Sequence, residues 1–165
     1  MAQITLKGNP INTIGELPKI GETAKEFTLV ASDLTEKKLS DFKGIKVVLN
    51  VFPSIDTGIC AASARKFNEE VSALENTVIL NISKDLPFAL TRFCAAEGLE
   101  KVINLSDFRG NFADDYQLKI TNGPLQGLAS RAVIVLDENG TVVYTEQVPE
   151  IAQEPDYEAA LKAVK

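Results

Sequence analysis

Residues 45–60, IKVVLNVFPSIDTGIC, join a run of β-branched and aliphatic side chains to a proline, a turn and a cysteine. The apolar run over 45–52 predicts a buried strand. Pro53 ends that strand, residues 54–58 predict a turn, and a helix is expected to follow to about Leu74. The side chains expected on the buried face of this helix recur at helical spacing and are Cys60, Ala64, Phe67, Val71 and Leu74.

The next segments repeat this pattern once. Residues 77–82 predict a second buried strand. A second helix is expected after it, with Pro87 in its first turn and Gly98 as its C-terminal stop. The side chains expected to line one side of that helix are Leu86, Leu90, Phe93 and Cys94.

The C-terminal part of the chain predicts an irregular segment followed by a hairpin and a helix. The irregular segment contains a short strand at 102–105, a helical turn at 110–117 and a Gly/Pro loop at 121–128. Residues 132–136 and 141–145 predict two strands joined by an Asn-Gly turn. Pro155 is expected to open a final helix running to the end of the chain, whose inward side chains are Tyr157, Leu161 and Val164.

The N-terminal part predicts a small addition to this body. Residues 2–14 alternate weakly about Gly8-Asn9-Pro10, which predicts a short β-hairpin. An apolar piece at 27–30 is expected to reach the main body through the polar stretch 31–44. The whole order predicts one α/β domain over 1–165, a thioredoxin-like sandwich with a central mixed sheet, flanking helices and an N-terminal β-hairpin extension.

Composition excludes several classes of function. The 165 residues carry 17 basic and 23 acidic side chains, a net charge of −6, which argues against a nucleic-acid binder. The absence of histidine excludes Ser-His-Asp and Cys-His catalysis and histidine metal sites. No stretch reaches the roughly 18 apolar residues of a membrane helix, and the opening residues lack the features of a signal peptide. We therefore expect a cytoplasmic protein with reduced cysteines and neither metal nor cofactor.

Cys60 is the strongest candidate for chemistry. If Thr57 caps the helix, Cys60 occupies its third position, where unpaired N–H groups and the helix dipole favour an anion such as a thiolate. The alternative is that Cys60 is a small core residue, since it shares a face with Phe67. Its place after a central strand favours function, because ligand sites in open α/β sheets lie there.

Two further residues have alternative interpretations. Cys94 belongs to an apolar helical stripe and could be a core residue, but beside a reactive Cys60 it could condense with a sulfenic acid. Arg131 directly precedes the apolar run 132–136. It could be an ordinary solvated arginine, or it could hold Cys60 as a thiolate.

The sequence also resembles a known family. Residues 53–60, PSIDTGIC, match the peroxiredoxin signature Pro-x-x-x-Thr-x-x-Cys. The surrounding blocks are similar to the thiol peroxidase subfamily, the atypical two-cysteine peroxiredoxins of bacteria. These blocks are NVFPSIDTGICAA at 50–62, SKDLPFA at 83–89 leading to RFC at 92–94, GLASRA at 127–132, EPDY at 154–157 and the opening Gly8-Asn9-Pro10.

The resemblance implies an activity and residue roles. By it, Cys60 is the peroxidatic cysteine, Cys94 the resolving cysteine that forms an intramolecular disulfide with it, and Pro53 shapes the pocket. Thr57 and Arg131 would activate Cys60 and position the peroxide. The implied enzyme is a homodimer that reduces hydrogen peroxide and alkyl or lipid hydroperoxides, with thioredoxin as the reductant.

Two other classes of function stay open at this point. A thiol–disulfide oxidoreductase of the same fold would carry a second thiol at position 63, where this sequence has serine. A non-enzymatic thioredoxin-like module would carry an unreactive Cys60.

Overall fold

The computed structural model describes residues 2–70, 74–97 and 102–164. Its elements follow in the order β1 (Gln3–Leu6), β2 (Asn9–Asn12), β3 (Thr28–Ala31), β4 (Glu36–Lys38), the 3-10 helix η1 (Leu39–Phe42), β5 (Lys46–Val51), α1 (Gly58–Glu70), β6 (Thr77–Ser83), α2 (Pro87–Glu97), β7 (Ile103–Ser106), α3 (Phe112–Asp115), β8 (Ala132–Leu136), β9 (Val142–Gln147) and α4 (Tyr157–Lys162).

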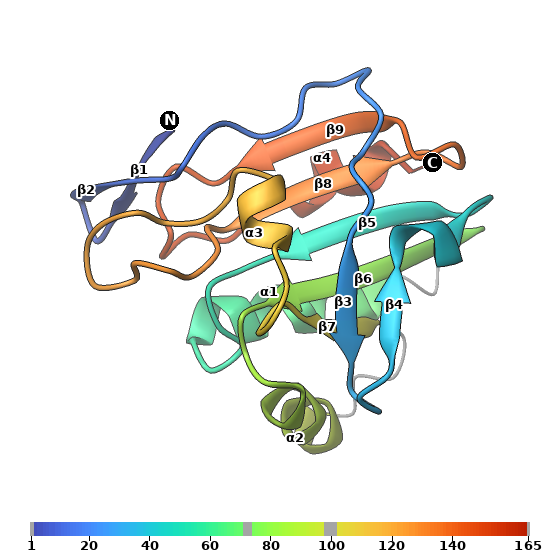
Figure 1. The fold of residues 1–165 in the computed structure, drawn as a ribbon, viewed down its shortest axis with the longest axis horizontal. Coiled ribbons are helices and arrows are strands. Elements are labelled where there is room, and N and C mark those ends of the chain that lie inside the picture. Colours follow the sequence, from blue (N-terminus) through green and yellow to red (C-terminus); the bar gives the residue numbers. More distant parts are fainter. Residues whose placement is uncertain (1, 71–73, 98–101, 165) are drawn as a thin grey trace.

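A seven-stranded mixed sheet forms the centre, with strand order β4-β3-β7-β6-β5-β8-β9 (Figure 1). The strands β5, β6 and β7 run parallel, whereas β8 and β3 pair antiparallel with β5 and β7. Five of the six β5 residues are buried, as expected of a strand covered on both faces. The separate hairpin β1–β2 lies to one side of the sheet (Figure 1).

Each face of the sheet has its own apolar core. The helices α1, α2 and α4 contribute to one core, which contains Cys60, Phe67, Leu90 and Leu161 and is completed by partly buried side chains that include Cys94. The helix α3 and the segment around η1 cover the other face. Both cysteines therefore lie in the core between the sheet and α1, α2 and α4.

The expected fold class is confirmed: a mixed sheet between helices, with an N-terminal hairpin. The strands predicted from residue 45 onward match β5 to β9 to within a residue or two. No helix among the described residues is long and apolar enough to cross a membrane.

Three details of the expected elements are wrong. Leu86 precedes α2 and is 51% exposed, because the buried face of the helix starts at Pro87, its first residue, and continues at Leu90. Pro155 does not open the last helix; Asp156 is its N-cap, accepting a hydrogen bond from Ala159 N at 3.0 Å. That helix also ends at Lys162 rather than at the chain end.

The polar stretch 31–44 is more than a connection. It contains β4 and η1, and β4 pairs with β3 at the edge of the sheet. Edge strands are often short and charged, so Glu36–Lys38 lacks the alternation of apolar and polar residues that identifies a strand in a sequence.

The N-terminal hairpin turns at Lys7 and Gly8, both with positive φ, while Asn9 and Pro10 already belong to β2. The expected positions of Val71 and Gly98 lie outside the described residues.

Candidate functional site

The candidate site lies at the connection between the C-terminal end of β5 and the N-terminus of α1. Pro53 follows this strand and is buried, and the chain turns through residues 54–57 before α1 begins. Cys60 is the third residue of α1, and its side chain is fully buried. The expected position of Cys60 in the first turn of the helix is thus confirmed.

Arg131 reaches the site from the neighbouring antiparallel strand. In the β5–β8 pairing Val51 lies opposite Ala132, so the residue before β8 falls at the end of β5. The guanidinium donates from Nη2 to Cys60 Sγ at 3.1 Å and from Nε to the Ile151 carbonyl at 2.8 Å. Of the two alternatives left open for Arg131, the solvated strand-end arginine is therefore wrong, since Arg131 is only 2% exposed.

The charge of Arg131 has no carboxylate partner among the described residues. A buried cation is costly unless an anion or hydrogen-bond acceptors compensate it. The two acceptors here are one carbonyl and the Cys60 sulfur, of which only the sulfur can become an anion. The Nη1 nitrogen of Arg131 is buried without a hydrogen-bond partner in the described part of the chain. The arrangement therefore sets a cationic donor against the Cys60 sulfur and leaves a second guanidinium nitrogen available beside it.

Thr57 lies directly before α1 and is exposed. Its carbonyl accepts from Ala61 N at 3.0 Å, as the carbonyl of an N-cap residue does. Its hydroxyl donates to the Ser54 carbonyl at 3.0 Å and thereby closes the turn before the helix. In this arrangement the hydroxyl stabilises the loop that carries Cys60.

Tyr157 on α4 lies near Cys60 and Arg131, whereas the sequence predicted only that its side chain points into the core. Its ring packs edge-on against Phe67 at 5.3 Å, and its hydroxyl donates to Glu154 at 2.8 Å. Burial and the Glu154 carboxylate raise the pKa of Tyr157; Arg131 opposes and Cys60 reinforces this rise. The phenol therefore stays neutral and closes the core beside the sulfur and the guanidinium.

Cys94 has different surroundings. It lies on α2, is half-buried, and accepts a hydrogen bond from Asn104 Nδ2. Burial raises the pKa of the Cys94 thiol, and the Asn104 bond opposes the rise. Neither cysteine is in a disulfide.

Asp85 joins the Cys60 loop to the segment before α2. Its carboxylate accepts from Ser54 Oγ, Ile55 N and Ser83 Oγ, each at 2.7 Å. Arg92 on α2 also reaches Asp56 at 3.6 Å across the surface. The sequence contains no sign of this role for Asp85, because Ser54 and Ile55 lie in a loop about 30 residues earlier in the chain.

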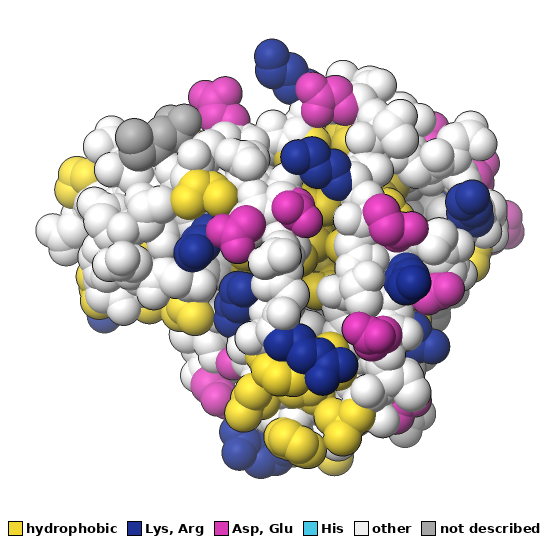
Figure 2. Space-filling view, in the orientation of Figure 1, with side chains coloured by type: hydrophobic (Ala, Val, Ile, Leu, Met, Phe, Trp, Pro, Cys, Tyr) yellow, Lys and Arg dark blue, Asp and Glu magenta, His cyan; other side chains and the backbone are white. Residues whose placement is uncertain are grey.

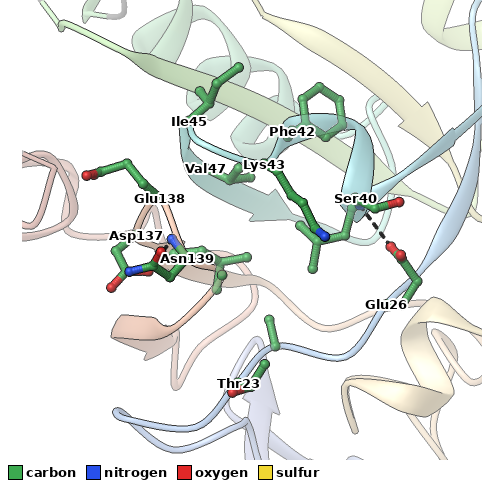
Figure 3. Close-up of a pocket in the computed structure, with 14 residues that line it drawn as sticks. Thr23, Glu26, Ser40, Phe42, Lys43, Ile45, Val47, Asp137, Glu138 and Asn139 are labelled. Atoms are coloured by element: carbon green, nitrogen blue, oxygen red, sulfur yellow. Dashed lines mark hydrogen bonds between the residues drawn. The ribbon is translucent and has the colours of Figure 1, made fainter.

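A cavity of about 180 Å³ lies elsewhere, at the other end of β5 (Figure 3). Phe42, Ile45 and Val47 contribute its apolar wall, and the turn at 137–140 forms its rim. None of the candidate residues lines it. The described residues also contain no group of three or more acidic, cysteine or histidine side chains placed to hold a metal.

Comparison with known proteins gives a consistent result. A family model described as Redoxin matches residues 19–161. The chain is 55% identical over 164 residues to the thiol peroxidase of Corynebacterium glutamicum, with 99% of both chains covered. It is 54% identical to the thiol peroxidase of Mycobacterium tuberculosis, again over 99% of both. Among solved structures, a peroxiredoxin-like protein from Aquifex aeolicus matches with a TM-score of 0.93 and 38% identity, covering 99% of this chain and 96% of that one.

Proposed function

Because the chain belongs to the Redoxin family, and within it to the thiol peroxidases, we propose that it reduces hydroperoxides with Cys60 as the attacking thiolate. The observation that carries this assignment to Cys60 is the hydrogen bond from the buried Arg131 guanidinium to its sulfur. The thiolate is the nucleophilic form of cysteine, so a group that stabilises it prepares the attack. The proposed mechanism requires no histidine, because its nucleophile is a thiolate stabilised by Arg131 and not a thiol deprotonated during the attack.

The chemical step transfers one oxygen. The Cys60 thiolate attacks the terminal oxygen of the peroxide, an S–O bond forms and the O–O bond breaks. The sulfur is oxidised to a sulfenic acid, while the leaving alkoxide or hydroxide takes a proton and departs as alcohol or water. The unpaired Arg131 Nη1 is the donor suited to the negative charge that develops on the peroxide oxygens.

The peroxide needs a route to a sulfur that is fully buried. The exposed residues Asp56, Thr57 and Gly58 lie next to it along the chain. We propose that this loop admits the substrate, that the Thr57 hydroxyl then turns from the Ser54 carbonyl to the peroxide, and that Pro53 forms the floor of the opening. Hydrogen peroxide and alkyl or lipid hydroperoxides are the proposed substrates.

We propose that Cys94 completes the cycle. Its thiolate attacks the sulfenic sulfur of Cys60, an S–S bond forms, the S–O bond breaks, and hydroxide leaves as water after taking a proton. Thioredoxin then reduces the disulfide by thiol–disulfide exchange. The competing oxidoreductase reading has no support at position 63, where a buried serine donates to the Cys60 carbonyl at 3.0 Å.

The proposed assembly is a cytoplasmic homodimer of a single-domain chain. Large apolar side chains are exposed at Leu34, Leu86, Phe88 and Phe108. Figure 2 shows hydrophobic side chains gathered at the end of the molecule where α2 lies. An apolar surface of this kind favours association. Sedimentation velocity should give twice the chain mass for the native protein, and Phe88→Asp should shift it toward the monomer.

The test of the proposed function is mass spectrometry of the reduced protein after one equivalent of an alkyl hydroperoxide. The expected product has lost two hydrogens and gives a linked Cys60–Cys94 peptide. Cys94→Ser should retain the first oxidation and accumulate sulfenic acid or intermolecular disulfide. Slow oxidation without preference for Cys60 would instead favour a non-enzymatic module.

A further inference from the structure

Three asparagines form a buried hydrogen-bonded row across the parallel strands. Asn50 pairs in register with Asn81, and Asn81 with Asn104. Asn50 Nδ2 donates to Asn81 Oδ1 at 2.9 Å, and Asn81 Nδ2 donates to Asn104 Oδ1 at 3.1 Å. We call these three residues the asparagine ladder. Their exposed fractions are 1%, 0% and 8%.

The ladder connects the helices of the two cysteines. At one end, Asn104 Nδ2 donates to Cys94 Sγ. At the other, Asn50 Nδ2 donates at 3.4 Å to Ser63 Oγ, whose hydroxyl donates at 3.0 Å to the carbonyl of Cys60. A continuous chain of hydrogen bonds thus runs from the backbone of α1 through three strands to the sulfur on α2.

Packing alone does not account for this row. Val48 and Ile79, two residues earlier on β5 and β6, face the same core and are apolar. Burying an amide is unfavourable unless its hydrogen bonds are made, and Asn50 Oδ1 is buried without a partner among the described residues. The row therefore includes an unfavourable buried oxygen, Asn50 Oδ1, and at its other end an amide, that of Asn104, which donates to the Cys94 thiol.

From this geometry we propose that Asn104 is a catalytic residue of the resolving step, and that Asn81 and Asn50 are its positioning residues. Asn104 donates to the Cys94 sulfur and stabilises it as the attacking thiolate. Asn81 Nδ2 donates a hydrogen bond to Asn104 Oδ1, and this bond orients the Asn104 amide so that its Nδ2 faces the Cys94 sulfur. The inference rests on the proposed function, because it concerns the attack of Cys94 on the Cys60 sulfenic acid.

The experiment separates the two steps by rapid quenching and mass spectrometry after addition of an alkyl hydroperoxide. One measured rate is the loss of the Cys60 thiol, and the other is the formation of the disulfide. Asn104→Leu, which keeps the shape of the side chain without its donor, should slow disulfide formation about tenfold and leave the first rate unchanged. Asn81→Leu should act in the same direction with a smaller effect.

Two further measurements distinguish this role from a loss of packing. In a Cys60→Ser background Cys94 is the remaining thiol, and its thiolate fraction can be read by ultraviolet absorbance at one mildly alkaline pH. Asn104→Leu should lower that fraction, and so should Asn104→Asp, which keeps the size and also serves if the leucine variant does not fold. Thr13→Val is the matched control: it removes a buried hydroxyl that donates to Gly15 at 2.6 Å, outside α1 and α2, and should change neither readout.

The possible results separate the two claims. If the parent protein forms no Cys60–Cys94 disulfide, the proposed cycle and the role of the ladder both fail. If it does, and Asn104→Leu forms the disulfide at the parent rate or faster, the inference alone is overturned. An unchanged Cys94 thiolate fraction in both Asn104 variants would overturn it as well.

Discussion

The two cysteines contribute to one core but lie in very different surroundings. Cys60 is fully buried, stands in the first turn of α1 and accepts from a guanidinium. Cys94 is only half-buried, stands late in α2 and accepts from a neutral amide. The more buried sulfur is thus the one that a cationic donor contacts at the start of a helix, and this contrast underlies the proposed division of roles.

The strongest test of this contrast replaces each sulfur in turn. Cys60→Ser should lower peroxidase turnover by roughly a thousandfold or more, because it removes the nucleophile. Cys94→Ser should still consume one equivalent of peroxide in a single turnover. Equal losses of that first equivalent in the two variants would contradict the division of roles.

A second test removes the charge that distinguishes the two thiols. Arg131→Met should slow the oxidation of Cys60 by about 10²- to 10³-fold, because it deletes the cation beside the sulfur. The alkylation rate of Cys94 should stay unchanged in this variant, because Arg131 contacts the Cys60 sulfur whereas Cys94 accepts from Asn104. Arg131→Lys keeps the charge and should recover part of the rate, although it cannot make both the Nε and Nη2 bonds.

A third test concerns the connection between the two sites. Asp85→Asn should lower the free energy of unfolding by about 2 kcal/mol, because it weakens three hydrogen bonds to one carboxylate. The Cys60 oxidation rate should fall several-fold as the loop loosens, with Cys94 less affected. Denaturant unfolding with Asp41→Asn as the control would check this; Asp41 is an exposed carboxylate that accepts from Lys38 N at 2.8 Å.

The smallest effect is expected from acid. Backbone hydrogen bonds from Ala152 and Gly8 lower the pKa of Glu150 to about 2 from its usual 4.5. Since the folded pKa is the lower one, the stabilisation is complete above pH 4.5 and is lost as the pH falls toward about 2. Glu150 is partly buried and precedes Ile151, whose carbonyl accepts from Arg131. Loss of the Glu150 charge should therefore slightly loosen the Cys60 side alone. In the Glu150→Gln variant the unfolding midpoint should change less with pH over this interval than in the parent protein. The same pH dependence in both proteins would contradict the prediction.

The sequence was a good guide to the strands and a partial guide to the site. Strands such as β5 and β8 are buried on both faces, so each is a nearly continuous run of apolar residues that can be recognised in the sequence. The edge strand β4 carries charged side chains and does not. Leu86 was misplaced because helical spacing continues past the point where the helix begins.

The partners of both thiols depend on register between strands. Arg131 meets Cys60 across 71 positions of sequence only through the β5–β8 pairing. The asparagine ladder likewise requires Asn50, Asn81 and Asn104 to align across three strands. Sequence patterns locate such residues within their own strand, but they do not give the alignment that brings them together.

The long separation between Cys60 and Arg131 has a consequence for synthesis. Cys60 leaves the ribosome well before Arg131, so the thiol lacks its guanidinium until β8 has been made and has paired with β5. On the proposed function, a nascent or partly folded chain carries Cys60 without its activating cation, so its oxidation by peroxide should be slow until β8 is in place. In refolding, the proposed reactivity of Cys60 toward peroxide should be acquired together with the β5–β8 contact.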